Sequence, residues 1–208
     1  MKRALVSLSL AAVVAIGVAG CGSDSESSTD SGAGSVDTTS APDQVRWETW
    51  QGVEVPVSSV DGPRSINGAV AAGYTQTPQG AVLAAAQGLT RLRLAPDDAW
   101  PQVANAVAAP GKGRDLYAVS RVQVSITGPV PAGSVDALRG FRVDEFSPDR
   151  AVVELVTEQS ASGLTASTHT LVWSGDDWKV LLPDPDGDSP QPEPVASLAD
   201  YTQFEAKQ

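Results

Sequence analysis

One cysteine and one histidine carry most of the chemistry available to this chain. Cys21 is the only thiol and His169 the only imidazole among its 208 residues. A single cysteine excludes an intramolecular disulfide. A single histidine leaves one side chain at most that could act as the base of a Ser–His–Asp or Cys–His arrangement. The sequence therefore restricts nucleophilic catalysis of this type to a site that contains His169.

His169 lies in a segment of alternating polarity, Leu164 to Trp173, which predicts a strand. The alternation places His169 on the same face as Leu171 and Trp173, and this favours a half-buried strand histidine. The alternative is a general base in a pocket, which would need a partner such as Asp144, Glu154 or Tyr117 beside it. The spacing of these residues does not bring them together by itself.

Three patterns resemble metal or phosphate sites without meeting their requirements. In the acidic run 184–188, Gly187 stands at position 4 and Val195 at position 12, where an EF-hand loop needs Gly at 6 and Glu at 12. Residues 109–114 lack the spacing and the following Ser/Thr of a phosphate loop. The chain has no Cys/His cluster for zinc. The sequence predicts no cofactor, no metal site and no catalytic set.

The chain begins with Met1, Lys2 and Arg3, followed by an apolar run from Ala4 to Ala19. Cations before an apolar stretch that ends in small residues are typical of a secretory signal. The run is short and is interrupted by serine and glycine, so a permanent transmembrane helix, which needs roughly 20 apolar residues, is disfavoured.

The residues that close this run, Val18, Ala19, Gly20 and Cys21, resemble the lipobox of bacterial lipoproteins. The resemblance implies cleavage after Gly20 and a diacylglycerol thioether on Cys21. Acyl chains added in this way anchor a protein stably to a bilayer. The alternative is a plain signal peptide that happens to end in a cysteine. The lipobox interpretation places the chain on the extracytoplasmic face of the cell membrane.

The formal net charge of the chain is −11, and removal of residues 1–20 makes it more negative still. An acidic surface argues against nucleic acid as a partner, and also against lying flat on an anionic membrane. The bias toward Ala, Val, Asp, Gly and Pro, with few lysines, resembles proteins of high-GC actinobacteria.

Composition divides the chain into four parts. Residues 1–20 are the predicted signal peptide. Residues 21–45 are the acylated cysteine and a Ser/Thr/Gly/Asp-rich tether without aromatic residues, which we expect to be disordered. Residues 46–182 form the folded domain. Residues 183–208 are a Pro/Asp-rich segment that ends in a short docking helix carrying Leu198, Tyr201 and Phe204.

The first half of the domain predicts helices after an extended lead-in. Residues 46–57 indicate a short edge strand that includes Pro56, with Trp47 and Trp50 packed on the core or, alternatively, exposed as a binding platform. A Gly/Ser/Pro-rich loop follows over 58–74. Thr77 and Pro78 are typical of the N-cap and first position of a helix, and a second helix is predicted from about Asp97 to Ala108.

The second half predicts strands. The segments 116–127, 140–146, 151–158, 164–173 and 178–182 alternate or are apolar and are separated by turn residues. Consecutive hairpins indicate an antiparallel meander. The predicted class is therefore α+β, with N-terminal helices packed on a curved antiparallel sheet of about five strands.

This order of elements is similar to that of the NTF2-like (cystatin-like) α+β cone. A closing hairpin with the pattern of Trp173, Gly175, Trp178 and Val180 is common in that family. The resemblance covers roughly residues 75–182 and implies a cone that can hold a small apolar ligand. The segment Gly73–Ala86 also resembles a motif of actinobacterial membrane-tethered proteins, some of which accompany conjugation or secretion machinery.

Two functions remain open at this stage. The first is a non-enzymatic, lipid-anchored accessory or interaction domain of the cell envelope, linked to secretion or conjugation machinery and bound to an envelope protein. The second is a small apolar ligand-binding protein, or an isomerase or cyclase of the NTF2-like kind that uses His169.

Overall fold

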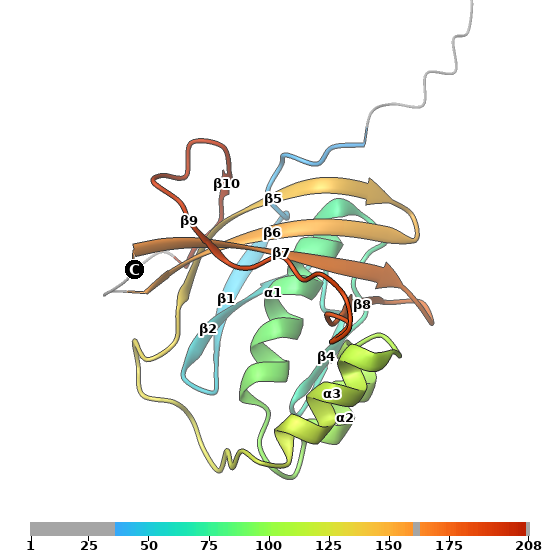
Figure 1. Ribbon diagram of the computed structural model, residues 1–208. Coiled ribbons are helices and arrows are strands. Elements are labelled where there is room, and N and C mark those ends of the chain that lie inside the picture. The colour runs from blue at the N-terminus through green and yellow to red at the C-terminus, as the bar shows by residue number, and fades with distance from the viewer. Residues whose placement is uncertain (1–35, 160–162, 207–208) are drawn as a thin grey trace, which may run out of the picture. The chain divides into compact units, whose positions relative to one another are not determined.

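The computed structural model describes residues 36–159 and 163–206, which form an α+β fold (Figure 1). The predicted signal peptide, the lipobox-like residues with Cys21 and most of the predicted tether lie outside the described residues. The predicted α+β class, with helices and a largely antiparallel sheet, is confirmed. Over the described part of the chain, no helix is long and apolar enough to cross a bilayer.

The main sheet is an open antiparallel meander. Its long strands are β5 Ala137–Ser147, β6 Arg150–Gln159, β7 Gly163–Trp173 and β8 Trp178–Leu181, and each pairs with the next. Two short strands extend it, β10 Thr202–Gln203 beside β5 and β9 Glu193–Pro194 beside β7. The predicted meander over 140–182 is confirmed, because period-2 alternation and short turns together fix antiparallel neighbours.

The closing hairpin between β7 and β8 has the predicted turn. Gly175 has a φ of 64°, and the Ser174 amide donates to the Asp177 carbonyl at 2.9 Å. The rings of Trp173 and Trp178 meet edge to face, with centroids 5.3 Å apart. The hairpin therefore brings two large aromatic side chains to the same end of the sheet.

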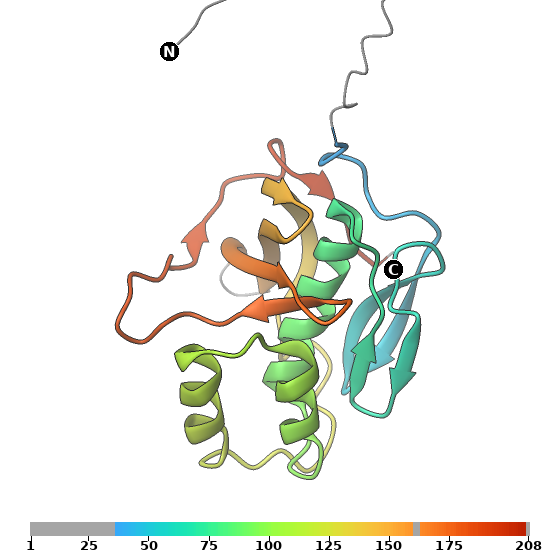
Figure 2. The ribbon, with the colours of Figure 1, turned by 90° about the vertical axis from the view of Figure 1, so that its right-hand side faces the viewer.

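Helix α1, Pro78–Leu94, begins where the sequence predicts. Thr77 is its N-cap, and the Thr77 hydroxyl accepts from the Gly80 amide at 3.0 Å. Residues 81–86 are buried on every side of the helix, not along one stripe. The cause is that α1 lies between two layers, the main sheet on one side and a separate hairpin on the other (Figure 2). A helix that is covered all round is apolar all round.

That separate hairpin is formed by β1 Val45–Trp50 and β2 Val53–Ser58. Gln51 and Gly52 both have positive φ, as a tight two-residue hairpin turn requires. Pro56 is tolerated because a two-stranded sheet has only edge strands. Trp47 packs against Phe204 with ring centroids 5.3 Å apart, so this tryptophan packs on the core as the first interpretation expected.

The expectation of N-terminal helices is wrong. Two hairpins precede α1, because β1 and β2 are followed by β3 Ser65–Asn67 and β4 Val70–Ala72. The β3–β4 hairpin replaces part of the loop predicted over 58–74. Its strands are three residues long and mostly exposed or half-buried, so they carry almost no apolar alternation for a sequence pattern to detect.

The strand predicted over 116–127 is also wrong. Helix α2, Trp100–Val107, is followed at once by α3, Lys112–Arg121. Tyr117 anchors α3 by donating to the Leu92 carbonyl at 2.8 Å. Beyond the helix, Asp97 accepts from the Ile126 amide at 2.9 Å and from Arg121 Nη2 at 2.9 Å. Residues 116–121 thus belong to α3, and side chains of Asp97 and Arg121 hold the rest of the alternating segment as a loop, in place of strand partners.

No helix forms in residues 195–206, where a docking helix was expected. The segment turns and adds β10 to the sheet instead. The docking itself is confirmed, because the Phe204 ring is 6% exposed and lies edge to face with Phe141, centroids 5.7 Å apart. Pairing with the edge of β5 gives the backbone of Thr202 and Gln203 the hydrogen bonds that a single helical turn would lack.

The segment Gly73–Ala86 has a structural explanation. The Asp177 carboxylate accepts from the amides of Gly73 and Tyr74 at 2.8 and 3.1 Å, and Trp178 Nε1 donates to the Thr75 carbonyl at 2.8 Å. A side chain at Gly80 would place Cβ only 2.0 Å from the Thr75 carbonyl oxygen. These contacts fasten the start of α1 to the β7–β8 hairpin.

Candidate functional site

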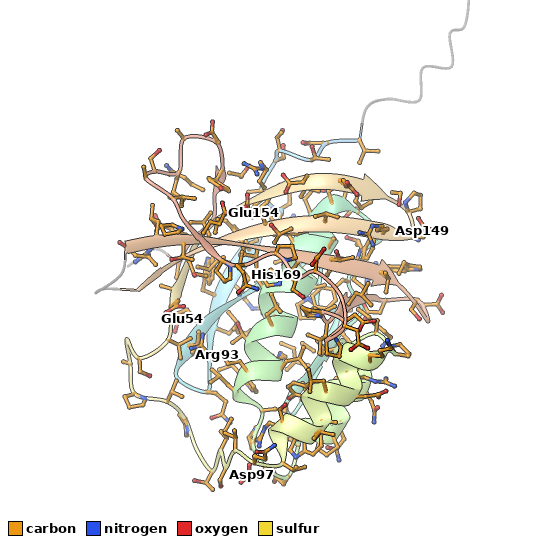
Figure 3. The ribbon with its side chains drawn as sticks, viewed as in Figure 1. Glu54, Arg93, Asp97, Asp149, Glu154 and His169 are labelled. Atoms are coloured by element: carbon orange, nitrogen blue, oxygen red, sulfur yellow. The ribbon has the colours of Figure 1, made fainter. Side chains whose placement is uncertain are left out.

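A cleft of about 400 Å³ opens between α1 and the inner face of the main sheet. One wall is the second half of α1, and the facing wall comes from β5, β6 and β7. The β1–β2 hairpin and the loop before β5 border the cleft at the side, and Glu54 of β2 and Arg93 of α1 both line it (Figure 3). The residues of α1 that line the cleft come from its second half, Ala86 to Leu94, whereas residues 81–86 of its first half belong to the core against the sheet.

The walls of the cleft are mainly apolar. Leu89 and Leu92 line it from α1, and Leu138 and Leu155 line it from the sheet. Val53 and Pro56 of β2 contribute to the border. A concave apolar surface of this size with a few polar groups is typical of small-molecule sites.

His169 and Ser167 supply polar groups on the sheet wall. They alternate along β7 and so point to the same face, and Ser167 Oγ lies 2.9 Å from His169 Nε2. The prediction that His169 faces inward with Leu171 is confirmed by the register, in which His169 lies opposite Val153 and Leu171 opposite Ala151. Burial lowers the pKa of the His169 imidazole from 6.5 to about 4. The ring is therefore neutral at neutral pH.

The neutral state of His169 predicts a loss of stability in acid. The unfolded chain protonates His169 below its ordinary pKa of 6.5, whereas the folded chain resists protonation until about pH 4. The free energy of unfolding should therefore fall as the pH is lowered from 6.5 to 4, by about 3 kcal/mol from this group.

Urea unfolding of the wild type and His169→Gln across this pH range would measure the effect. Glutamine does not titrate, so the difference in unfolding free energy between the two proteins should narrow or reverse toward pH 4. Two parallel pH profiles would contradict a buried neutral imidazole.

The border of the cleft carries three charged side chains, Glu54, Arg93 and Asp136. Arg93 Nη1 lies 4.0 Å from Asp136 Oδ2 in a partly exposed pair. Glu54 accepts a hydrogen bond from Thr49. Among the described residues, Glu54 has no cationic partner within 4.0 Å. The border therefore has two carboxylates for one guanidinium.

A second cavity of about 480 Å³ adjoins the cleft, and both are lined by Leu89, Ser167, His169 and Leu182. The Pro/Asp-rich residues after β8 border it on the outside. Lys112 holds this segment in place, with Nζ 2.8 Å from Asp186 and 3.6 Å from Asp184. The acidic run 184–188 is thus paired with a lysine, and the described residues contain no group of three or more His, Cys, Asp or Glu placed to hold a metal.

The partners that general-base chemistry would need do not converge on His169. Glu154 lies opposite Thr168 in the register and therefore on the other face of the sheet (Figure 3). Glu154 and Asp144 both pair with Arg142, at 2.7 and 2.6 Å. Tyr117 does line the cleft, but its hydroxyl donates to the Leu92 carbonyl. His169 is thus the only one of these candidates with an uncommitted polar atom in the cleft.

Some residues of the site could have been predicted from the sequence, and others could not. Strand alternation from His169 could have indicated Ser167 on the same face and, through the register, Thr157 on the neighbouring strand. Glu54, Arg93 and Asp136 come from three different segments and meet only through the tertiary fold.

Comparison with known protein families gives one match. The model of a family described as a domain of unknown function, DUF8175, matches residues 15–203. The chain belongs to this family. The match spans every described strand and helix, from β1 to β10, so the α+β unit with its cleft is the structure of a DUF8175 domain. No curated protein matches the chain, and no solved structure matches it either.

Proposed function

We propose that this DUF8175 protein is a lipid-anchored protein on the extracytoplasmic face of the cell membrane, and that its domain binds a small apolar ligand in the cleft. The observation that carries the binding proposal is the apolar cleft beside a neutral histidine. Anchoring rests on Val18, Ala19, Gly20 and Cys21. The actinobacterial origin and the NTF2-like cone belong to the same proposal and are supported by composition, by the meander and by α1 against its inner face.

Binding without turnover fits the chemistry of the cleft better than catalysis does. A general base works best when its pKa lies near the operating pH, and the pKa of His169 is about 4. Neither Asp144 nor Glu154 orients the ring. We therefore propose that His169 and Ser167 hydrogen-bond a neutral group of the ligand, and that an isomerase or cyclase activity is the weaker proposal.

An uncharged apolar dye, N-phenyl-naphthylamine, would test the cleft by its gain in fluorescence on binding. Thr157→Phe places a ring in the cleft and should weaken binding about tenfold or more, because the ring occupies the ligand's space. Val152→Phe is the matched control, since residue 152 lies on β6 with the opposite side-chain direction. Absence of dye binding to the wild type, or equal losses in both variants, would refute the proposal.

A second candidate function is docking of another envelope protein, and an apolar stripe on α3 favours it. Leu116, Val119 and Val122 recur every third residue and are 47, 63 and 69% exposed, and Val124 beyond them is 54% exposed. Figures 1 and 2 both place α3 at the end of the domain away from the first described residues. Anchoring through Cys21 would therefore leave the stripe accessible to other proteins. The occupant we propose is therefore an apolar surface of an envelope protein, such as a component of secretion or conjugation machinery.

A photo-crosslinking amino acid at Val119 in intact cells would test this docking. We expect one discrete protein adduct that is lost when Leu116→Asp is introduced alongside, because a carboxylate on the stripe prevents apolar contact. The same probe at Val60, which is 44% exposed, should give none. A lipid adduct, or an adduct that survives Leu116→Asp, would contradict protein docking at the stripe.

A further inference from the structure

The charges at the border of the cleft decide which apolar molecules can enter it. Glu54 and Arg93 are exposed and stand at the opening, where any polar end of an elongated ligand must lie. Arg93 has Asp136 beside it at 4.0 Å, with 58 and 32% of the two side chains exposed. The positive charge of Arg93 is thus partly offset, and the carboxylate of Glu54 remains without a cation among the described residues.

The other polar groups of the cleft cannot compensate for this imbalance. Thr90, Thr157 and Ser167 carry neutral hydroxyls. Burial holds the pKa of His169 near 4, so its imidazole is uncharged at neutral pH. The whole chain is acidic as well, with a formal net charge of −11. A negatively charged ligand would therefore meet two carboxylates and one guanidinium at the opening. Among the described residues that line the cleft itself, Arg93 is the only cation, whereas Lys112 and Arg114 line the adjoining cavity.

We infer that the ligand of this cleft is a cationic amphiphile, an elongated apolar molecule with an amine at one end. The inference rests on the proposed binding function and names its ligand class. The apolar part would lie along Leu89, Leu92, Leu138 and Leu155, and the ammonium would lie at the opening beside Glu54. Fatty acids of the same length, which are anions, would be disfavoured by the same two carboxylates.

Three probes of equal chain length separate charge from apolar contact: decylamine, decanol and decanoate. Each would be measured by calorimetry at neutral pH, below its micelle concentration. An exposed ion pair changes affinity by up to about fivefold. Replacing attraction by repulsion at Glu54 should therefore make decylamine bind about tenfold or more tightly than decanoate, with decanol between them. High salt should narrow the difference, because these charges are accessible to solvent.

Glu54→Gln removes the proposed contact and keeps the size of the side chain. It should reduce the preference for the amine over the carboxylate by about fivefold, while decanol binding stays unchanged. The matched control is Glu145→Gln, which alters the net charge equally at an exposed glutamate of β5 outside the cleft. It should leave all three affinities within twofold.

The outcomes distinguish this inference from the proposed function. Tightest binding of decylamine, lost selectively in Glu54→Gln, supports a cationic ligand. Tightest binding of decanoate or decanol overturns the ligand class and leaves an apolar ligand site standing. Equal effects of Glu54→Gln and Glu145→Gln show that net charge alone sets the preference, and overturn the role of Glu54. Binding of none of the three overturns both the ligand class and the proposed function.

Discussion

Replacing Arg91 with alanine should destabilise the domain by about 4 kcal/mol. Arg91 lies on α1 and is only 1% exposed. Its Nε donates to Gln87 Oε1 at 2.8 Å and its Nη1 donates to the Ala69 carbonyl at 2.8 Å. The guanidinium also lies over the Trp50 ring, 4.7 Å from its centroid. Through these contacts Arg91 joins α1 to the two hairpins that precede it.

Alanine would remove all three contacts at once and would leave a void. One buried and one partly buried acceptor would lose their donors, at about 1–3 kcal/mol for the buried one, and deletion of a large buried side chain adds a cavity cost. Burial lowers the pKa of Arg91. The hydrogen bonds to Gln87 and Ala69 offset the free-energy cost of burying its charge. Gln87 in turn donates to the Pro56 carbonyl at 2.9 Å.

Urea unfolding would measure the loss, and Arg93→Ala is the control. Arg93 lies two residues further along the same helix, but 58% of its side chain is exposed. Its replacement should change the free energy of unfolding by about 0.5 kcal/mol or less, as is usual at the surface. Similar losses in the two variants would show that the Arg91 contacts contribute little.

Replacing Cys21 with alanine should abolish acylation of the chain completely. The thioether can form only on a thiol, and Cys21 is the only one in the sequence. The residue lies outside the described part of the chain, 15 positions before Val36, so no described contact depends on it. The unfolding free energy of the domain should therefore stay unchanged.

Mass spectrometry of the N-terminal peptide of the mature protein would read the result. The wild type should begin at Cys21 and carry two or more acyl chains, enough for stable anchoring. Ser23→Ala, two residues away, should be acylated like the wild type. An unmodified Cys21 in the wild type, or cleavage at another position, would overturn the proposed location in the membrane.

The two arginines of α1 show where sequence patterns reach their limit. Arg91 and Arg93 flank Leu92, and nothing in their spacing says that one is buried and the other exposed. Thr77 and Pro78 predicted where α1 begins, whereas no sequence pattern predicted that the hairpin β1–β2 covers the side of the helix opposite the main sheet. Burial of Arg91 follows from that second layer, which only the tertiary fold supplies.

The strands of the meander could be predicted because their evidence is local. Alternation along 140–173 and the turn residues at 147–150 and 174–177 fix both the strands and their neighbours. The same criterion failed for 116–127, where alternating valines are exposed and side chains of Asp97 and Arg121 hold the backbone. Local alternation shows which side chains of a segment could share a face. Whether the segment becomes a strand depends on whether another strand is available to pair with it.

The candidate site divides in the same way. The inward direction of His169 follows from alternation, and its lowered pKa follows from burial on that face. The free space beside it depends on how the second half of α1 packs relative to β5, β6 and β7. The charged border depends on β2, α1 and the loop before β5 meeting at one place. These are relations between segments far apart in the chain, which no local pattern records.

Because α1 lies between two layers, it stays uncovered until the last strand of the main meander has been synthesised. Residues 81–86 of α1 leave the ribosome long before β8, which ends at Leu181 and completes the sheet that covers them. At usual translation rates this interval is on the order of ten seconds. An apolar helix exposed for that time, and for as long as an exported chain stays unfolded, invites aggregation, so the unfolded chain should need a chaperone until β8 can pair. Chains that stop before Trp178 would keep α1 uncovered and should be degraded rapidly.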